Sequence, residues 1–168
     1  MRIIVLLMAA IAADAATVVQ MACGGPGGAG WAPDTKVGGG SYWTAANQPA
    51  MAYQPIPYQS LCYSSGTLPF SRTFTLPAGN YSVTLKMLDP NKTAAGQRIF
   101  NASINGVPVL MAFDLFAAAG GALKPYDRAF QVAAPGGIIQ ITLAGVVGNA
   151  VLSAVQIDSV PIVPPSTA

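Results

Sequence analysis

Aromatic side chains that could stack on a ligand gather in one part of the chain. Six of the eight Trp and Tyr residues lie within positions 31–63, namely Trp31, Tyr42, Trp43, Tyr53, Tyr58 and Tyr63. Amides are interleaved with them, at Asn47, Gln48, Gln54 and Gln59. Sugar rings present apolar C–H faces that stack on aromatic rings, and their hydroxyls require polar neighbours. The segment therefore predicts either a carbohydrate-binding surface or loops whose rings pack onto the rest of the domain.

Other residue types exclude most catalytic and metal chemistry. The 168 residues include no His, no Glu and only two Cys. This composition rules out Ser-His-Asp and Cys-His catalysis, His-ligated metals and four-thiolate sites. The Asp residues form no recognisable pair for glycoside hydrolysis, and the two best candidates, Asp89 and Asp114, are more typical of turns or caps. We therefore expect a protein that is not an enzyme and holds no cofactor or metal.

Charged residues are scarce. They make up 8% of the chain and leave a formal net charge of +2, whereas an average soluble domain has roughly 25% charged residues. A net charge this small argues against a nucleic-acid partner, and the lack of charged surface residues argues against a helical bundle. An apolar surface with few charges often marks a protein interface. A structural or self-assembling protein, binding itself or other surface proteins, is therefore the alternative to a binding module.

The N-terminus has the pattern of a secretory signal over residues 1–15. Arg2 supplies the positive charge, residues 3–11 the apolar stretch and residues 13–15 an Ala-Asp-Ala cleavage site. A buried N-terminal strand or helix is the alternative. The apolar run is too short to cross about 30 Å of hydrocarbon, and every later apolar stretch is interrupted. We therefore expect a secreted or cell-surface protein that does not insert into the membrane after the signal is removed.

Two cysteines outside the cytosol favour a disulfide. Cys23 and Cys62 are separated by a loop of about 40 residues, whose closure would stabilise the fold by roughly 4 kcal/mol on the chain-entropy model. The alternative is two buried thiols that never meet. Neither Cys has a basic neighbour close in sequence that would make it a reactive thiolate.

Hydrophobic periodicity predicts an all-β fold. Residues 80–88 alternate apolar and polar side chains, as a half-buried strand does, and Asn105-Gly106 is typical of a type I′ hairpin turn. Strands and turns of this kind fill 67–158, whereas 17–66 predicts one strand, 17–23, followed by loops. With about eight to ten short strands in all, the sequence predicts an antiparallel jelly-roll-like β-sandwich over 17–160. Residues 161–168 form a Pro-rich tail.

Seven short motifs, in order along 18–158, resemble the malectin and malectin-like carbohydrate-binding domains. The most characteristic is 96–106, which is similar to the family's G-x-R-x-F-D-V-x-I-N-G. The others are the first strand ending in Cys-Gly-Gly at 18–25, the aromatic loop at 31–42, and the segments 57–60, 81–87, 113–121 and 148–157. The resemblance implies a jelly-roll-like sandwich, related to galactose-binding domains, with long binding loops at one end.

The resemblance also implies a ligand site, with departures from the family pattern. Malectin holds a glucose disaccharide among loop aromatics and one Asp. In this sequence Asn91 and Lys92 replace an aromatic pair, and Gly148 stands where malectin has that Asp. We therefore expect an oligosaccharide or polysaccharide other than that disaccharide. The expected stacking wall is Tyr42, Trp43, Tyr58 and Tyr63, and the expected polar residues are Asp89, Asn91, Lys92 and Asn149.

Overall fold

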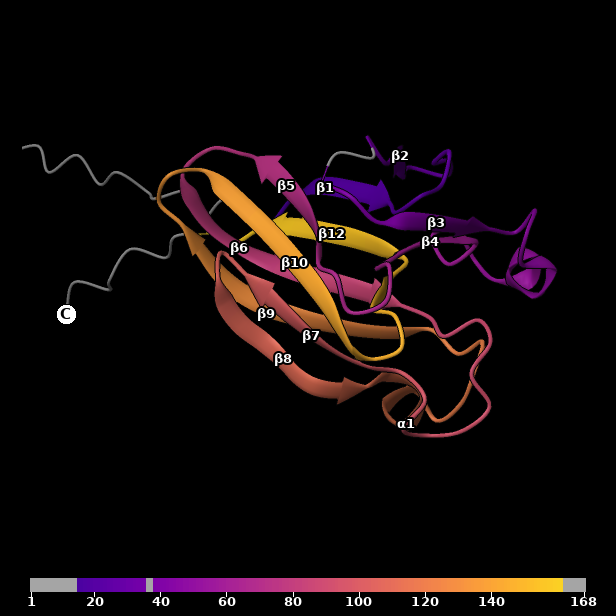
Figure 1. The fold of residues 1–168 in the computed structure, drawn as a ribbon. Helices are drawn as coiled ribbons and strands as arrows, with labels where there is room; N and C mark the ends of the chain where they lie inside the picture. The colour runs from indigo at the N-terminus through magenta and orange to yellow at the C-terminus, as the bar shows by residue number, and fades with distance from the viewer. Residues whose placement is uncertain (1–14, 36–37, 162–168) are drawn as a thin grey trace, which may run out of the picture.

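Two β-sheets pack face to face in the computed structural model, which describes residues 15–35 and 38–161 (Figure 1). The larger sheet has the strand order β2-β1-β12-β6-β9, and the second has the order β5-β10-β7-β8. A small third sheet has the order β11-β4-β3. The pairings are antiparallel except for a two-residue parallel contact between β1 and β2. The expected all-β sandwich is therefore confirmed.

The elements have the following bounds. In sheet order, the five-stranded sheet contains Ala32–Pro33 (β2), Thr17–Ala22 (β1), Ala154–Ser159 (β12), Gly79–Met87 (β6) and Tyr126–Ala134 (β9). The four-stranded sheet contains Phe70–Thr75 (β5), Ile138–Val147 (β10), Ile99–Ile104 (β7) and Val107–Asp114 (β8). The three-stranded sheet contains Val151–Leu152 (β11), Ser60–Tyr63 (β4) and Ser41–Thr44 (β3). A 3-10 helix, η1, covers Pro49–Tyr53, and one short α-helix, α1, covers Leu115–Ala119.

The core lies between the two large sheets and follows from strand alternation. Every second residue of β6 points inward and is buried, and β10 presents a matching buried row from the other sheet. These residues are Tyr81, Val83, Leu85 and Met87 on β6, and Ile139, Ile141 and Leu143 on β10. Burying one such aliphatic side chain contributes about 1.5–3 kcal/mol relative to leaving it exposed. The predicted half-buried strand at 80–88 is thus confirmed as β6.

The predicted hairpin is also present. Asn105 and Gly106 have φ values of 51° and 78°, which a type I′ turn requires at both central positions. The turn joins β7 to β8, whose register shifts twice before Asp114. Asp114 then caps α1, because its carboxylate accepts a hydrogen bond from the Ala117 N–H at 3.0 Å. The expectation that Asp114 is a cap residue is correct.

The expectation of one strand followed by loops in 17–66 is wrong. This segment also contains β2, β3 and β4, and the described residues form twelve strands in total. Strands β3 and β4 have four residues each, too few for alternation to be visible in the sequence. They exist because they pair with each other and because β4 pairs with β11, about 90 residues later in the chain. Such long-range pairing leaves no local signal.

The long loops gather at one end of the sandwich. Figure 1 shows η1 in the β3–β4 connection, α1, and the connection after β6 on the same side of the molecule. Most of the expected signal and of the Pro-rich tail falls outside the described residues. Within the described ranges, no helix has the length and apolarity needed to span a bilayer. The loop end is therefore the place to look for a ligand site.

Candidate functional site

A buried charged cluster anchors the base of the loop end. The expected Cys23–Cys62 disulfide is present, with the two Cα atoms 5.3 Å apart. Beside it, the buried Arg72 guanidinium from β5 donates to both carboxylate oxygens of Asp34, at 2.9 and 2.8 Å. The Gly24 N–H also donates to Asp34, at 3.1 Å. These contacts fix the loop after β1 against β4 and β5.

The cluster contains residue types that bind metals, but its sulfur atoms and its carboxylate are already engaged in other bonds. Asp34 and the two sulfurs place one potential ligand atom each within 4.8 Å of one another. The sulfurs are bonded to each other, so neither is a thiolate that could ligate a metal. The Asp34 carboxylate is engaged by Arg72. The arrangement therefore serves the fold.

Trp43 and Tyr63 form a pair of rings on one face of the three-stranded sheet. Trp43 lies on β3 and Tyr63 on the neighbouring β4, with ring centroids 4.6 Å apart and planes tilted by 32°. Both side chains are half-buried. The register pairs Ser41 with Tyr63 and Trp43 with Leu61, so all four side chains share one face. Two of the four predicted wall residues are thus brought together.

Tyr42 and Tyr58 lie elsewhere. Tyr42 pairs with Cys62 in the register, which turns its ring to the opposite face of the sheet. There its hydroxyl is 3.4 Å from the Arg72 Nη2. Tyr58 is buried, with 7% of its surface exposed, and its hydroxyl donates to Asp127 on β9. The four predicted aromatics therefore do not form a single stacking wall.

Tyr58 belongs to a chain of polar contacts on the outer face of the five-stranded sheet. The second carboxylate oxygen of Asp127 is 2.5 Å from the Lys86 ammonium group. That ammonium group lies 5.9 Å from the centroid of the Trp31 ring, within the range of a cation–π contact. This chain ties the β3–β4 connection and the loop after β1 to the strands β6 and β9.

The buried hydroxyl of Tyr58 should make the free energy of unfolding depend on pH in the alkaline range. Burial first, and then the hydrogen bond to Asp127 and its negative charge, raise the pKa of Tyr58 above its ordinary value of 10.0. The folded state therefore keeps this proton at a pH where the unfolded chain loses it. The stabilisation is complete below pH 10 and declines as the pH rises toward the folded-state pKa, by at most about 1.4 kcal/mol per pH unit.

The measurement is the free energy of unfolding in urea at about pH 8 and about pH 11. Tyr58→Phe should be less stable than the parent at the lower pH and should lose less stability on the way to the higher one. Tyr53→Phe, which changes a tyrosine that is 91% exposed, should follow the parent. Equal alkaline losses in the parent and Tyr58→Phe would contradict the assignment.

Three of the predicted polar residues form a second buried network, centred on Arg98. The fully buried Asp89 accepts from Arg98 Nε at 2.8 Å, and its other oxygen accepts from the backbone N–H groups of Asn91 and Lys92. Arg98 also donates to the Asn91 side chain at 3.1 Å and to the Asn149 carbonyl at 2.9 Å. These hydrogen bonds of Asp89, Asn91 and Asn149 hold the loops in place. Asp89 thus has the turn role that its sequence position predicts.

This network brings the loops next to the ring pair. The Asn149 side chain donates to the carbonyl of Ser64, the residue that follows Tyr63. The Ser64 hydroxyl accepts from the Ala150 N–H at 2.8 Å. Lys92 is half-buried, and its ammonium group makes no hydrogen bond or ion pair with the described part of the chain. Of the predicted polar residues, Lys92 is thus the one whose side chain keeps its full capacity to bind.

Sequence reasoning missed the two buried arginines. Arg72 alternates with Phe70 and Phe74 on β5, which places it on an apolar face, and Arg98 lies in the 96–106 motif. A charged residue at an inward-facing position of a strand signals a buried partner. The partners, Asp34 and Asp89, lie in loops, so their pairing could not be deduced from strand periodicity.

Comparisons with known proteins agree with the architecture. The sequence profile of the Malectin domain matches residues 17–159. Among solved structures, the ANX2 ectodomain from Arabidopsis thaliana superposes with a TM-score of 0.73 at 15% identity, covering 88% of this chain and 50% of that one. The ANX1 ectodomain from Arabidopsis thaliana gives 0.71 at 14% identity, covering 88% and 49%.

A third neighbour is a plant complex of the peptide RALF23 with FER and LLG2. It matches with a TM-score of 0.73 at 16% identity, covering 85% of this chain and 48% of that one. The chain spans about half the length of these structures, and at these identities the likeness concerns the fold. A search of curated proteins found no match.

Proposed function

The chain belongs to the Malectin domain family, and from this we propose that it is a secreted, non-catalytic module that binds an oligosaccharide or polysaccharide. The observation that carries the proposal is the Trp43–Tyr63 pair, two half-buried rings 4.6 Å apart on one sheet face. Aromatic faces of this kind stack on the C–H face of a sugar. Tyr42 and Tyr58 act as supports rather than as contacts.

Polar groups of the kind that a sugar requires belong to loops that hydrogen bonds connect to the residue after Tyr63. The loop of Asn91 and Lys92 and the loop of Asn149 are tied to Ser64, next to Tyr63, by the Arg98 network. In this proposal Lys92 donates to ligand hydroxyls, while Asn91 and Asn149 offer the remaining capacity of their amides. Because these loops are held by buried hydrogen bonds, little conformational entropy is lost when a ligand is bound.

Replacing Trp43 by Ala should weaken binding by about 2 kcal/mol, roughly thirtyfold, which is the scale of a central aromatic contact. The measurement is calorimetric titration with a panel of soluble tetrasaccharides, together with pull-down on cellulose, chitin and xylan. Tyr53→Ala is the matched control, because Tyr53 is an aromatic loop residue that is 91% exposed and lies outside the ring pair. Unchanged binding in Trp43→Ala, with Tyr53→Ala also unchanged, would contradict the proposal.

A second candidate function, self-assembly, is favoured by the free edge of β9. Strand β9 pairs with β6 through nine consecutive residues without a register shift. The other edge strands are protected. Strand β8 contains Pro108 and has register shifts, and in β5 the Ser71 N–H donates to the Gly38 carbonyl. Strands β2, β3 and β11 are short. A long, regular edge strand without such protection presents unpaired backbone N–H and C=O groups, which can pair with a further strand.

A second copy of β9 suits this edge. A two-fold axis that overlaps all nine residues is centred on Phe130, the middle of the strand. It places Arg128 opposite Val132 of the second copy and Asp127 opposite Ala133, so no like charges face each other. It also places Ala129 opposite Gln131 of the second copy. All of Asp127, Arg128, Ala129 and Gln131 are exposed in the single chain.

Sedimentation velocity tests this second function. The parent should dimerise at micromolar to millimolar concentration. In the paired edges, position 129 of each copy lies opposite position 131 of the other. The double variant Ala129→Lys/Gln131→Lys therefore places like charges opposite each other and should be monomeric. Ala129→Lys/Gln131→Glu places unlike charges opposite each other and should dimerise as the parent does. A parent that stays monomeric, or a lysine pair that leaves dimerisation intact, would rule out this edge as the interface.

A further inference from the structure

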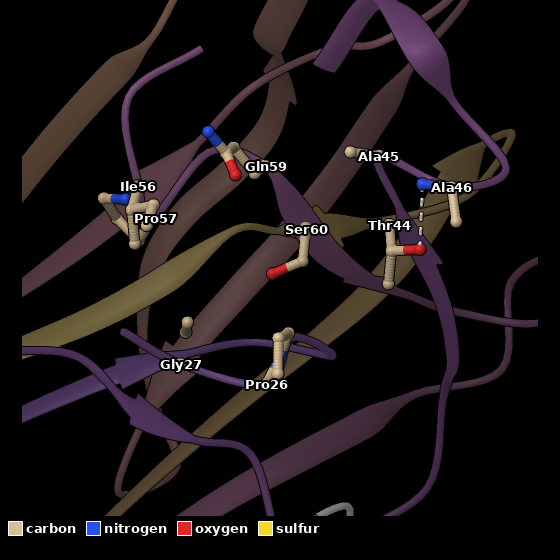
Figure 2. Close-up of a pocket in the computed structure, with 10 residues that line it drawn as sticks. Pro26, Gly27, Thr44, Ala45, Ala46, Ile56, Pro57, Gln59 and Ser60 are labelled. Carbon is tan, nitrogen blue, oxygen red and sulfur yellow. Dashed lines mark hydrogen bonds between the residues drawn. The ribbon is translucent and has the colours of Figure 1, made fainter. Parts of the chain in front are cut away.

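A hollow on the other side of the β3–β4 sheet is not used by the proposed ring site. Its volume is about 260 Å³, and it lies between the loop after β1 and the β3–β4 connection (Figure 2). Thr44 and Ser60 line it and pair with each other in the register. Because Trp43 and Leu61 are the next pair, their side chains project from the opposite face. The hollow and the Trp43–Tyr63 pair are therefore separate sites.

Polar groups in this hollow have hydrogen-bonding capacity that the protein does not use. The Ser60 side chain points into the hollow (Figure 2), and the residue is only 4% exposed. Among the residues with described coordinates, the Ser60 hydroxyl has no hydrogen-bond partner. Gln59 donates through Nε2 to the Gln54 carbonyl at 2.9 Å, which leaves its own side-chain oxygen free to accept. Ser60 is buried and Gln59 is half-buried, and the unused hydrogen-bonding capacity of both side chains is open to a polar ligand in the hollow.

Thr44 adds a third such group. Its hydroxyl oxygen accepts from the Ala46 N–H at 3.3 Å, and the hydroxyl proton remains available to donate. The rest of the lining is apolar and includes Pro26, Ile56 and Pro57. One side of the otherwise apolar hollow therefore carries three polar groups. The Ser60 hydroxyl can donate or accept, the Gln59 side-chain oxygen can accept, and the Thr44 hydroxyl can donate.

The lining selects the class of ligand. Among the described residues, no charged side chain lines the hollow, so these residues offer no counter-charge to a phosphate or carboxylate. A wholly apolar ligand would leave the Ser60 hydroxyl and the Gln59 oxygen unsatisfied, which is unfavourable. A sugar ring has hydroxyls for these groups and a C–H face for Pro26, Ile56 and Pro57. At roughly 30 Å³ per water molecule, the volume corresponds to about nine waters, the scale of one ring rather than of a chain.

We infer that this hollow is a second carbohydrate site, which takes a single neutral sugar residue such as the end of a glycan. The inference rests on the proposed function only in that both assume a carbohydrate ligand. The binding residues are different, because the hollow uses neither ring of the Trp43–Tyr63 pair. Ser60 and Gln59 are the binding residues, and Thr44 is an additional donor. Gly25 permits the arrangement, since a Cβ there would lie 2.3 Å from the Ser60 hydroxyl oxygen.

The test is amide chemical-shift mapping of the full chain with glucose, galactose, mannose and N-acetylglucosamine as separate probes. At least one sugar should shift the amide signals of Gly27, Ala46 and Ser60. Ser60→Ala should weaken that binding about tenfold, the effect of losing one buried hydrogen bond. Ser65→Ala, at an exposed serine nearby in sequence, should leave it unchanged.

A second variant keeps the inference testable if Ser60→Ala perturbs the fold. Ala46 lines the hollow and is exposed, so Ala46→Trp fills the entrance without disturbing the core and should abolish the shifts. Trp43→Ala should leave the Gly27 and Ser60 shifts intact, which separates this site from the proposed ring site. Shifts confined to Trp43 and Tyr63, shifts that persist in Ala46→Trp, or no shift with any of the four sugars would overturn the inference.

Discussion

Replacing Arg98 by Met is expected to lower the free energy of unfolding by about 3–5 kcal/mol. Arg98 is 1% exposed, and its partner Asp89 is fully buried. The substitution leaves the Asp89 carboxylate buried without a counter-charge and removes the hydrogen bonds to Asn91 and Asn149. Because a domain of this size is stable by only about 5–15 kcal/mol, the effect is a large share of the total.

Urea unfolding followed by circular dichroism measures this loss. Arg128→Met is the matched control, since Arg128 is an exposed arginine and such changes usually alter stability by about 0.5 kcal/mol or less. The double variant Arg98→Met/Asp89→Leu removes both charges and should recover part of the stability. A loss in Arg98→Met no larger than that in Arg128→Met would show that the network does not hold the loops.

Loss of the Cys23–Cys62 disulfide is expected to have an effect of similar size. The bond closes a loop with a sequence separation of 39, and the chain-entropy model assigns such a loop about 4 kcal/mol. The bond also joins the end of β1 to β4, a strand of only four residues. We therefore expect the β3–β4 sheet, and with it the ring pair, to be the part of the fold most dependent on the bond.

Unfolding of the double variant Cys23→Ala/Cys62→Ala, compared with the parent under oxidising and reducing conditions, tests this expectation. The parent should lose stability on reduction, and the double variant should be insensitive to the reductant. The Tyr63 and Trp43 amide signals should change more in the variant than those of the central strand β6. A reduced parent as stable as the oxidised one would contradict a structural role for the bond.

Local patterns were sufficient to predict the long strands and the turns. Strand β6 alternates over nine residues, and the Asn105-Gly106 turn depends on the backbone preferences of its own two residues. Asp89 and Asp114 were expected in turns or caps, and both take such roles. In each case the physical cause acts within a few residues of chain, so it is visible in the sequence.

The arrangement of the aromatics could not be predicted in the same way. Trp43 and Tyr63 meet because β3 and β4 pair in one particular register, and Tyr42 points to the other face because it is one residue out of step. Tyr58 is held by Asp127 from a strand about 70 residues later. Composition identifies a segment rich in rings, whereas long-range pairing decides which rings face a ligand.

The scarcity of charge has a partial structural explanation. Four of the charged residues form two buried ion pairs, Arg72 with Asp34 and Arg98 with Asp89. The outer surface is consequently even poorer in charge than the composition indicates, which suits both a sugar-binding surface and the proposed pairing of β9 edges. The sedimentation experiment decides whether the second role is present beside the first.

Fluorescence of Trp43 during titration with oligosaccharides tests the central claim most directly. The chain has two tryptophans, so Trp31→Phe leaves Trp43 as the sole reporter within the proposed site. The proposal predicts a saturable change in Trp43 emission with at least one tetrasaccharide of the panel, and loss of that change in Tyr63→Ala. Trp43 emission that stays constant across the whole panel, in a protein shown to be folded, would contradict it.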